Sequence, residues 1–110
     1  MAGKFEIQKA KDGQFTFHFK AGNGRIVITS ERYVEKRKAE AGVASVQKNA
    51  AVEARFERKT AKNGQPYFVL KASNGEIIGQ SETYSSAGAM EKGIASLQKN
   101  APGARVIDLV

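Results

Sequence analysis

The feature that most constrains this chain is an internal duplication. The segment Ala-Ser-Val-Gln-Lys-Asn-Ala at residues 44–50 returns as Ala-Ser-Leu-Gln-Lys-Asn-Ala at residues 95–101, an offset of 51 residues. At the same offset, residues 5–54 align with residues 56–105 without a gap, and almost half of the aligned positions are identical. A match of this length indicates two copies of one structural unit, which constrains the fold more than any single motif does.

The two copies are expected to share one hydrophobic core. The chain has 110 residues, the size of one ordinary domain. Two independent units would each have a meagre core, because even the full chain buries only about 60–70% of its unfolded surface. We therefore predict a single domain over residues 1–110, with repeat one at about residues 3–53 and repeat two at residues 54–110.

Each copy opens with the pattern of three β-strands. In copy one, residues 4–8 and 15–20 alternate apolar and polar side chains, and residues 25–29 form a further apolar run. An Asp-Gly dipeptide separates the first two runs and an Asn-Gly dipeptide the next two, and copy two has Asn-Gly at both places. These dipeptides favour type I′ hairpin turns, in which both central residues have positive φ. The pattern predicts a three-stranded antiparallel meander in each copy.

The apolar spacing then changes to that of a helix, between residues 39 and 50 and again between residues 90 and 101. Ser85 or Ser86 is expected to cap the start of the second helix. The matching positions of copy one offer no cap, so we expect the first helix to begin earlier, near Ser30.

Both helices are expected to end at the shared Lys-Asn pair. Lys48 and Lys99 lie where a cation complements the helix dipole. Asn49 and Asn100 can adopt the left-handed conformation that often follows a helix. The shared Gln-Lys-Asn-Ala segment is therefore explained as a helix ending.

Extended sequence follows each helix. Residues 105–109 coincide, at the same offset, with the opening strand of an incomplete third copy. A lone meander with one helix leaves open sheet edges, which a final strand could close. We predict an α+β fold with one continuous antiparallel sheet and both helices on one face.

The repeated residues also carry a resemblance that extends over the whole chain in two copies. In copy one they are Gly13, Gln14, Phe17, Lys20, Ala21, Asn23, Gly24, Ser30, Glu31, Tyr33 and residues 42–50. This pattern resembles the YegP-like family of small bacterial proteins. The resemblance implies a βββαβ motif, present in tandem or as two subunits, with the C-terminal strands exchanged between the two motifs. It implies no activity and no catalytic residues. Copy one departs from the pattern at residues 34–38, where copy two has small side chains.

Composition excludes several classes of site. The chain has no Cys, which rules out disulfides, thiolate zinc sites and cysteine nucleophiles. The N-terminal residues alternate charged and apolar side chains, so we expect neither a signal peptide nor a membrane span. The expected location is the cytoplasm.

No catalytic constellation is visible. His18 is the single histidine of the chain. It lies on the other face of its strand from the three Phe residues, and we predict that its side chain is exposed at the surface. The carboxylates shared by the copies are dispersed, so they do not predict an acid–base pair. We therefore predict no catalytic residues, no metal site, no cofactor and no enzyme activity. Gly42 and Gly93, both mid-helix, predict a close approach of each helix to its neighbour rather than a ligand site.

Charge provides the main indication of a partner. The chain has 18 Lys and Arg residues against 11 Asp and Glu residues, a formal net charge of +7. A basic balance favours encounters with nucleic acid or acidic surfaces without defining a function. The best binding candidate is a basic patch at the start of the first helix, with two cations from the sheet. Its residues are Arg32, Lys36, Arg37, Lys38, Arg25 and Lys20. The alternative is an ordinary solvated helix face with a Lys36–Glu40 pair.

Three hypotheses remain. The first is a non-enzymatic cytoplasmic binding or interaction module, expected to be a monomer through pairing of its own copies rather than a strand-exchanged dimer. The second is nonspecific nucleic-acid binding through the basic patch. The third is an undescribed enzyme or small-ligand binder, which a deep pocket lined by shared polar residues would favour. Function-specific residues are expected among those that the two copies do not share.

Overall fold

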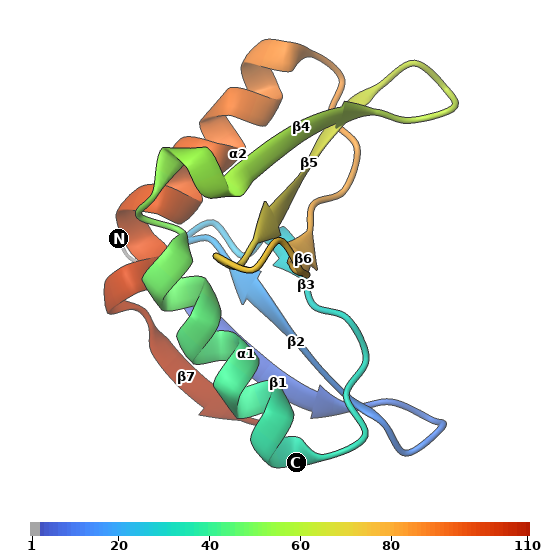
Figure 1. Ribbon diagram of the computed structural model, residues 1–110, viewed down its shortest axis with the longest axis vertical. Helices are drawn as coiled ribbons and strands as arrows, with labels where there is room; N and C mark the ends of the chain where they lie inside the picture. Colours follow the sequence, from blue (N-terminus) through green and yellow to red (C-terminus); the bar gives the residue numbers. More distant parts are fainter. Residues whose placement is uncertain (1–2) are drawn as a thin grey trace.

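A computed structural model describes residues 3–110 as two α-helices, two short 3-10 helices and a seven-stranded sheet (Figure 1). In chain order the elements are β1 (Lys4–Lys9), β2 (Phe15–Lys20), β3 (Ile26–Thr29), α1 (Lys36–Asn49), η1 (Glu53–Arg55), β4 (Phe56–Thr60), β5 (Pro66–Lys71), β6 (Ile77–Gln80), α2 (Ala87–Asn100), η2 (Ala101–Gly103) and β7 (Arg105–Asp108). The predicted α+β class, the two meanders and the two helices are confirmed.

The strands form one sheet in the order β4-β5-β6-β3-β2-β1-β7. The two meanders join where β3 and β6 pair, with Thr29 opposite Gln80. The prediction of a wholly antiparallel sheet is wrong at one place, because β7 runs parallel to β1 with Arg105 opposite Lys4. After α2, η2 turns the chain so that it enters the sheet where β1 begins, and β7 then runs in the direction of β1.

The C-terminal strand of copy two therefore lies in the half of the sheet that copy one forms. Copy one supplies no corresponding strand to the opposite edge, where β4 pairs with β5 alone among the described residues. The residues of copy one that match β7 are 54–57, and they already form the end of η1 and the start of β4. The structure thus contains one half of the reciprocal strand exchange.

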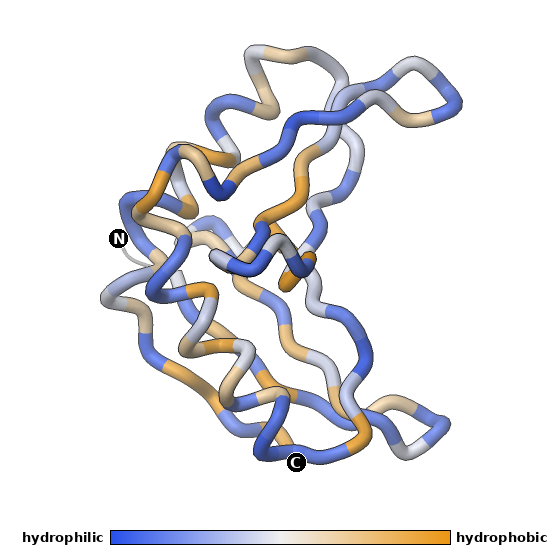
Figure 2. The backbone as a smooth tube through the Cα atoms, viewed as in Figure 1, coloured by the Kyte–Doolittle hydropathy of each residue, from blue (hydrophilic) through white to orange (hydrophobic). Residues whose placement is uncertain are grey.

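Both helices cover the same face of the sheet, and Figure 2 shows hydrophobic positions along the helices and strands of both copies. The buried apolar side chains of the two copies form one core cluster. Helix α1 contacts β5 and β6 of copy two as well as β1 and β2 of its own copy. Phe5, Phe17, Phe19 and Phe68 are fully buried. Each buried side chain of this size contributes about 1.5–3 kcal/mol. The single shared core is the arrangement expected from the size of the chain.

The first helix does not begin near Ser30. Tyr33 instead extends the sheet, with backbone hydrogen bonds of 2.7 and 2.8 Å to Phe15. Ser30 accepts a hydrogen bond from the Phe17 amide through its hydroxyl oxygen. Helix α1 begins only after this bridge and has no side-chain cap. In α2 the predicted cap is confirmed, since the Ser86 hydroxyl accepts a hydrogen bond from the Ala89 amide at 3.1 Å.

Left-handed asparagines do not end the helices. Within residues 3–110 positive φ occurs only at glycine. Asn49 and Asn100 are the last helical residues, and right-handed alanines follow them. The Asn49 amide donates a hydrogen bond to the Ser45 carbonyl, which satisfies the helix end from within.

The hairpin turns also differ from the type I′ turns predicted. The Asp or Asn before each turn glycine keeps a negative φ, and the glycine alone is left-handed, for example Gly13 with φ 85°. The Asp12 carboxylate accepts a hydrogen bond from the Gln14 amide at 3.0 Å. This side-chain bond stabilises a turn that needs one left-handed residue instead of two.

The predicted close approach at the mid-helix glycines is confirmed, and the neighbour is a tyrosine. A Cβ atom added to Gly42 would lie 2.7 Å from the Tyr33 hydroxyl and 2.8 Å from Phe17 Cε2. A Cβ atom added to Gly93 would collide with the Tyr84 hydroxyl in the same way. Each tyrosine follows the third strand of its copy, and its ring stacks on a core phenylalanine at 6.3 Å.

We predict that Gly42→Ala destabilises the chain although alanine favours helices. The gain in helix propensity is about 1 kcal/mol. Overpacking against Tyr33 and Phe17 costs about 1–3 kcal/mol beyond that gain. Urea unfolding of the variant measures the difference. The matched control is Gly88→Ala, because the nearest atom to its added Cβ is Ser86 Oγ at 3.9 Å. That control should be neutral or stabilising, and equal losses in both variants would contradict the packing argument.

Candidate functional site

The basic patch at the start of α1 is largely occupied by ion pairs. Arg32 contacts the Asp12 carboxylate at 2.9 Å, and Lys36 contacts Asp108. Glu35 accepts a hydrogen bond from Arg37 at 2.9 Å and forms an ion pair with Lys38 at 3.7 Å. All four cations of the helix start therefore have a carboxylate partner, although each remains partly exposed. Sequence reasoning identified the cations and missed the partners of Arg32 and Lys36, which come from the β1–β2 turn and from β7.

The structure separates the two sheet cations from this helix start. Lys20 ends β2, whereas α1 begins near the opposite end of β2, where Tyr33 pairs with Phe15. Lys20 contacts the Glu6 carboxylate at 3.0 Å. Arg25 lies in the β2–β3 turn and has no ion pair within residues 3–110. The six candidates do not form one continuous surface.

Arg25 lies in a cleft between the two copies, which we call the inter-repeat cleft. Its walls are the β2–β3 turn of copy one, the loop between β6 and α2, and one side of α2. Its volume is about 780 Å³. The lining residues are Ala21, Asn23, Gly24, Arg25, Ile26, Val27, Glu82, Thr83, Tyr84, Ser85, Ala89, Lys92, Gly93 and Ser96.

The inter-repeat cleft is open because copy two has small residues at the start of its helix. Ser85 and Ala89 line it, and the corresponding residues of copy one are Val34 and Lys38. Helix α2 presents residues at spacings of three and four along this side, which places Ala89, Lys92 and Ser96 in one wall. Residues that the copies do not share therefore determine the shape of the cleft.

Tyr84 gives the inter-repeat cleft an aromatic floor. Its ring stacks on Phe68 at 6.3 Å, and its hydroxyl lies against Gly93 of α2. Burial raises the pKa of the Tyr84 hydroxyl, a shift that the nearby Arg25 opposes. The tyrosine therefore stays protonated at neutral pH and offers a hydrogen-bond donor and acceptor beside an apolar ring.

Two cations and one carboxylate line the inter-repeat cleft. Arg25 and Lys92 have no carboxylate within ion-pair distance among the described residues, and Glu82 is the single acidic group of the lining. At the offset of 51 residues, Arg25 of copy one corresponds to Glu76 of copy two, and Lys92 of copy two corresponds to Ala41 of copy one. The equivalent place, formed by the residues 51 positions away, thus has a carboxylate and an alanine instead of the two cations.

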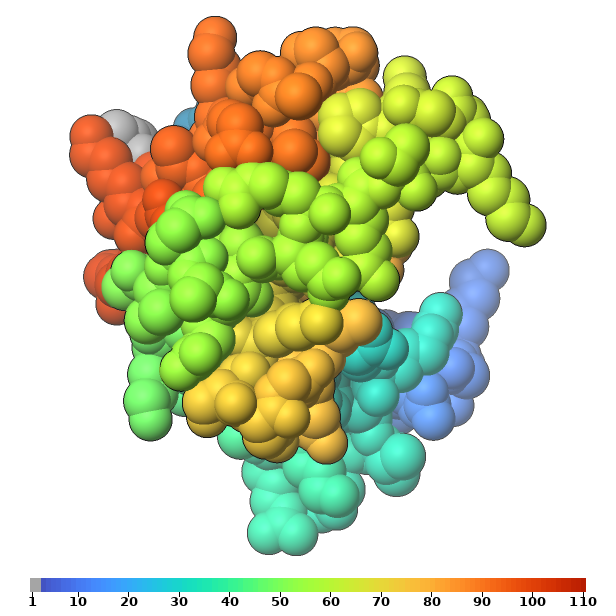
Figure 3. Space-filling view, turned by 45° about the horizontal axis from the view of Figure 1, so that its top comes forward, coloured from blue at the N-terminus to red at the C-terminus, as the bar shows by residue number. Residues whose placement is uncertain are grey.

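A second, more open hollow of about 510 Å³ lies at the base of the β4–β5 turn. Figure 3 shows this turn and the β1–β2 turn standing out from the body of the molecule as two separate arms. Glu82 and Thr83 line both the hollow and the inter-repeat cleft. The hollow adds Lys62 and Tyr67 to the polar surface on that side.

His18 is not the surface histidine that we predicted. Its ring is 5% exposed, lies 2.7 Å from the Glu6 carboxylate and 3.4 Å from Gln8, and belongs to a cross-strand pair. Because β7 covers the outer edge of β1, Glu6 lies on an interior strand and takes a partner from β2. No group of three His, Cys, Asp or Glu residues within residues 3–110 could hold a metal ion.

The Glu6 carboxyl is strongly held in its charged form. Hydrogen bonds from His18 and then from Lys20 lower its pKa from 4.5 to about 2. A carboxyl with a lower pKa in the folded chain contributes stability above its unfolded pKa. That contribution is present above pH 4.5 and is lost as the pH falls towards 2. The cluster is structural, because it lies outside the inter-repeat cleft.

We predict that Glu6→Gln lowers the free energy of unfolding at neutral pH by about 1–3 kcal/mol, the range for a buried group that loses its partner. Urea unfolding at a series of pH values should show the difference from wild type shrinking as the pH falls from 4.5 towards 2. The control is Glu57→Gln at the matching position of copy two, where the carboxylate is exposed and pairs with Lys71 alone. A pH-independent difference would contradict the assigned pKa.

None of the helices within residues 3–110 is long and apolar enough to cross a membrane. The profile of a domain of unknown function, DUF1508, matches residues 10–57 and again residues 61–108. The chain is 53% identical to a UPF0339 protein of Acinetobacter baylyi over 109 residues, with 99% of this chain and 98% of that protein covered. It is 51% identical to UPF0339 protein YegP of Escherichia coli over 108 residues, with 98% of each chain covered.

Solved structures show the same fold. The solution NMR structure of a UPF0339 protein from Shewanella oneidensis superposes with a TM-score of 0.93 at 46% identity, covering 99% of this chain and 92% of that one. The solution NMR structure of yegP from E. coli also gives 0.93, at 50% identity, covering 99% of this chain and 94% of that one. None of these names indicates an enzyme family.

Proposed function

The chain belongs to the family defined by DUF1508, a domain of unknown function, and we propose that it is a non-enzymatic binding protein that takes a small organic anion in the inter-repeat cleft. The observation that carries this proposal is the pairing state of the cations. Arg25 and Lys92 line a concave surface without a carboxylate partner, whereas the exposed cations at the start of α1 are paired.

The composition of the lining defines the ligand class. Ile26, Val27 and the Tyr84 ring offer apolar contact, and Arg25 and Lys92 offer charge-assisted hydrogen bonds to oxygen anions. Ligand sites in proteins commonly combine such an apolar surface with a few convergent polar groups. A carboxylate or phosphate attached to a small apolar body fits both parts of the inter-repeat cleft.

Binding without catalysis is supported by the chemistry of the lining. A nucleophilic mechanism needs a hydroxyl or thiol within hydrogen-bond reach of a base that activates it. The lining offers hydroxyls at Thr83, Ser85 and Ser96, and it contains no imidazole. His18 is engaged with Glu6 elsewhere.

Nucleic-acid binding through the basic patch receives less support. The four cations at the helix start already pair with three carboxylates, and Lys20 and Arg25 lie apart from them. Contact with phosphates would have to displace these pairs and would weaken steeply with salt. We expect no binding of DNA or RNA oligonucleotides even at low salt, measured by fluorescence anisotropy. Salt-sensitive binding that is lost on joint replacement of Arg32, Lys36, Arg37 and Lys38 would establish this alternative instead.

We predict that anionic probes shift the amide resonances around the inter-repeat cleft. Benzoate and phenyl phosphate should do so in a saturable manner, while benzamide and benzylammonium should bind far more weakly. Arg25→Glu should weaken anion binding about tenfold or more, because a charge-assisted hydrogen bond contributes about 1.5–3 kcal/mol. Lys48→Glu, which makes the same charge change at the far end of α1, is the control for general electrostatics.

A second pair of variants tests the shape of the inter-repeat cleft. Ser85→Val combined with Ala89→Lys places the residues of copy one in copy two and should close the cleft, so that the anion shifts disappear. Val34→Ser in copy one is the control and should leave them unchanged. Equal shifts from anionic and neutral probes, or shifts that survive both Arg25→Glu and the closing variant, would refute the proposed site.

A further inference from the structure

The two copies differ most at the outer edges of the sheet. β7 covers β1, whereas β4, the matching strand of copy two, is an edge strand. Ile7 of β1 is 1% exposed, and at the offset of 51 residues its counterpart in β4 is Arg58. An apolar residue therefore lies where a strand covers the edge, and a charged residue lies where the edge is open.

The backbone of β4 has free pairing groups on its outer side. In copy one the Ile7 carbonyl points outward and accepts a hydrogen bond from the Leu109 amide at 2.9 Å. Polar groups alternate in direction along a strand, and the matching β4 carbonyl is that of Arg58. The Ala61 amide donates a hydrogen bond to the Gln65 carbonyl, on the side of β5. The backbone groups of Phe56, Arg58 and Thr60 therefore point to the opposite side, away from β5.

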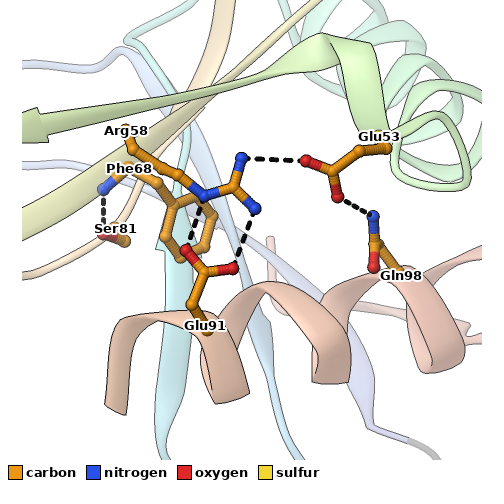
Figure 4. A network of polar contacts seen from close by, with 6 residues as sticks. All are labelled: Glu53, Arg58, Phe68, Ser81, Glu91 and Gln98. Atoms are coloured by element: carbon orange, nitrogen blue, oxygen red, sulfur yellow. Dashed lines mark hydrogen bonds and ion pairs between the residues drawn. The ribbon is translucent and has the colours of Figure 1, made fainter. Parts of the chain in front are cut away.

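A cluster of ion pairs lies beside the open edge of β4 (Figure 4). The Arg58 guanidinium donates to both Glu91 oxygens, at 2.6 and 2.8 Å, and to Glu53 at 2.8 Å. Gln98 donates to the other oxygen of Glu53 at 3.0 Å. We call these four residues the Arg58 cluster.

Two members of the Arg58 cluster, Arg58 and Glu53, are not shared at the offset of 51 residues. The counterpart of Glu53 is Ala104, whose carbonyl accepts the corresponding hydrogen bond, from Gln47 at 3.0 Å. Gln98 and Gln47 thus occupy matching positions. Gln98 lies beside the Glu53 carboxylate, and Gln47 lies beside the start of β7, the strand that covers β1.

The outer edge of β4 is complementary to itself. In an antiparallel pair of two β4 strands centred on Arg58, Glu57 of each chain lies opposite Lys59 of the other, on the helix-free face. Arg58 and Thr60 would supply backbone hydrogen bonds, and Phe56 would supply its carbonyl alone, because its amide already donates to the Glu53 carbonyl. Opposite charges at directly opposed positions stabilise such a pair. The Arg58 residues would meet at the centre, each within a cluster that holds two carboxylates, and like clusters oppose pairing.

We propose that the outer edge of β4 is a strand-pairing surface for a second copy of this chain, and that the Arg58 cluster keeps it closed. The occupant is a second copy because Glu57 and Lys59 complement each other only across a twofold axis. The proposal is independent of the inter-repeat cleft, whose lining contains no residue of β4.

The test replaces Arg58 and Glu53 by their counterparts, as Arg58→Ile with Glu53→Ala. Light scattering after gel filtration should give the mass of one chain for wild type and of two chains for the variant. Amide exchange should slow at positions 58 and 60 in the variant. Arg58→Thr, which keeps a polar residue in a strand, provides a second version should the first not fold. The matched control is Lys99→Ile with Glu76→Ala, which also replaces one cation by Ile and one Glu by Ala, away from β4, and should stay a monomer.

Exchanging the charges of Glu57 and Lys59 distinguishes specific strand pairing from nonspecific association. Adding Lys59→Glu to the variant places Glu57 opposite an acidic residue and should restore the monomer. Adding both Lys59→Glu and Glu57→Lys should recover the dimer. A folded variant that remains a monomer, a dimer insensitive to these charges, or a wild-type chain already paired through β4 would each overturn the proposal.

Discussion

The structure depends on a hydrophobic core that neither copy builds alone. The junction between β3 and β6 is short, with Thr29 opposite Gln80 as the paired position. Helix α1 spans this junction, because it contacts strands of both copies. Apolar burial beneath the helices, rather than backbone pairing at the junction, therefore holds the two halves together, as expected for a chain of this size.

A shared core keeps the two copies alike in their interior and leaves them free to differ at the surface. Phe17 and Phe68 match, as do Tyr33 and Tyr84, and each tyrosine takes the space that a mid-helix glycine leaves. The differences concentrate where the two copies have unequal surroundings. One such place is the start of the helix, where small residues open the inter-repeat cleft, and another is the outer edge of the sheet, where one copy has a covering strand.

The pattern of the chain was enough to predict the strands, the helix bodies and the apolar residues that form the core beneath the helices. Local signals such as alternation and helical spacing depend on neighbours in the sequence. The errors in the start of α1 and in the direction of β7 have a common cause in contacts that are distant in sequence. The backbone bridge from Tyr33 to Phe15 delays α1, and the direction of β7 depends on where η2 returns the chain. The cations at the start of α1 were identified from the sequence, but Lys20 and Arg25 lie apart from them, and the carboxylate partner of Lys36 is as far away in the sequence as Asp108.

Difference between the copies does not by itself identify a functional residue. His18 stands where copy two has Val69, yet its ring is buried against Glu6. His18 and Glu6 lie in the half of the sheet in which β7 covers β1. Arg25 and Lys92 also differ between the copies, but they line a concave surface and have no ion-pair partner among the described residues. The physical criterion is therefore whether the fold already satisfies the charge of the residue. A group whose charge the fold satisfies stabilises the fold, and a cation left unpaired in a cleft is available to a ligand.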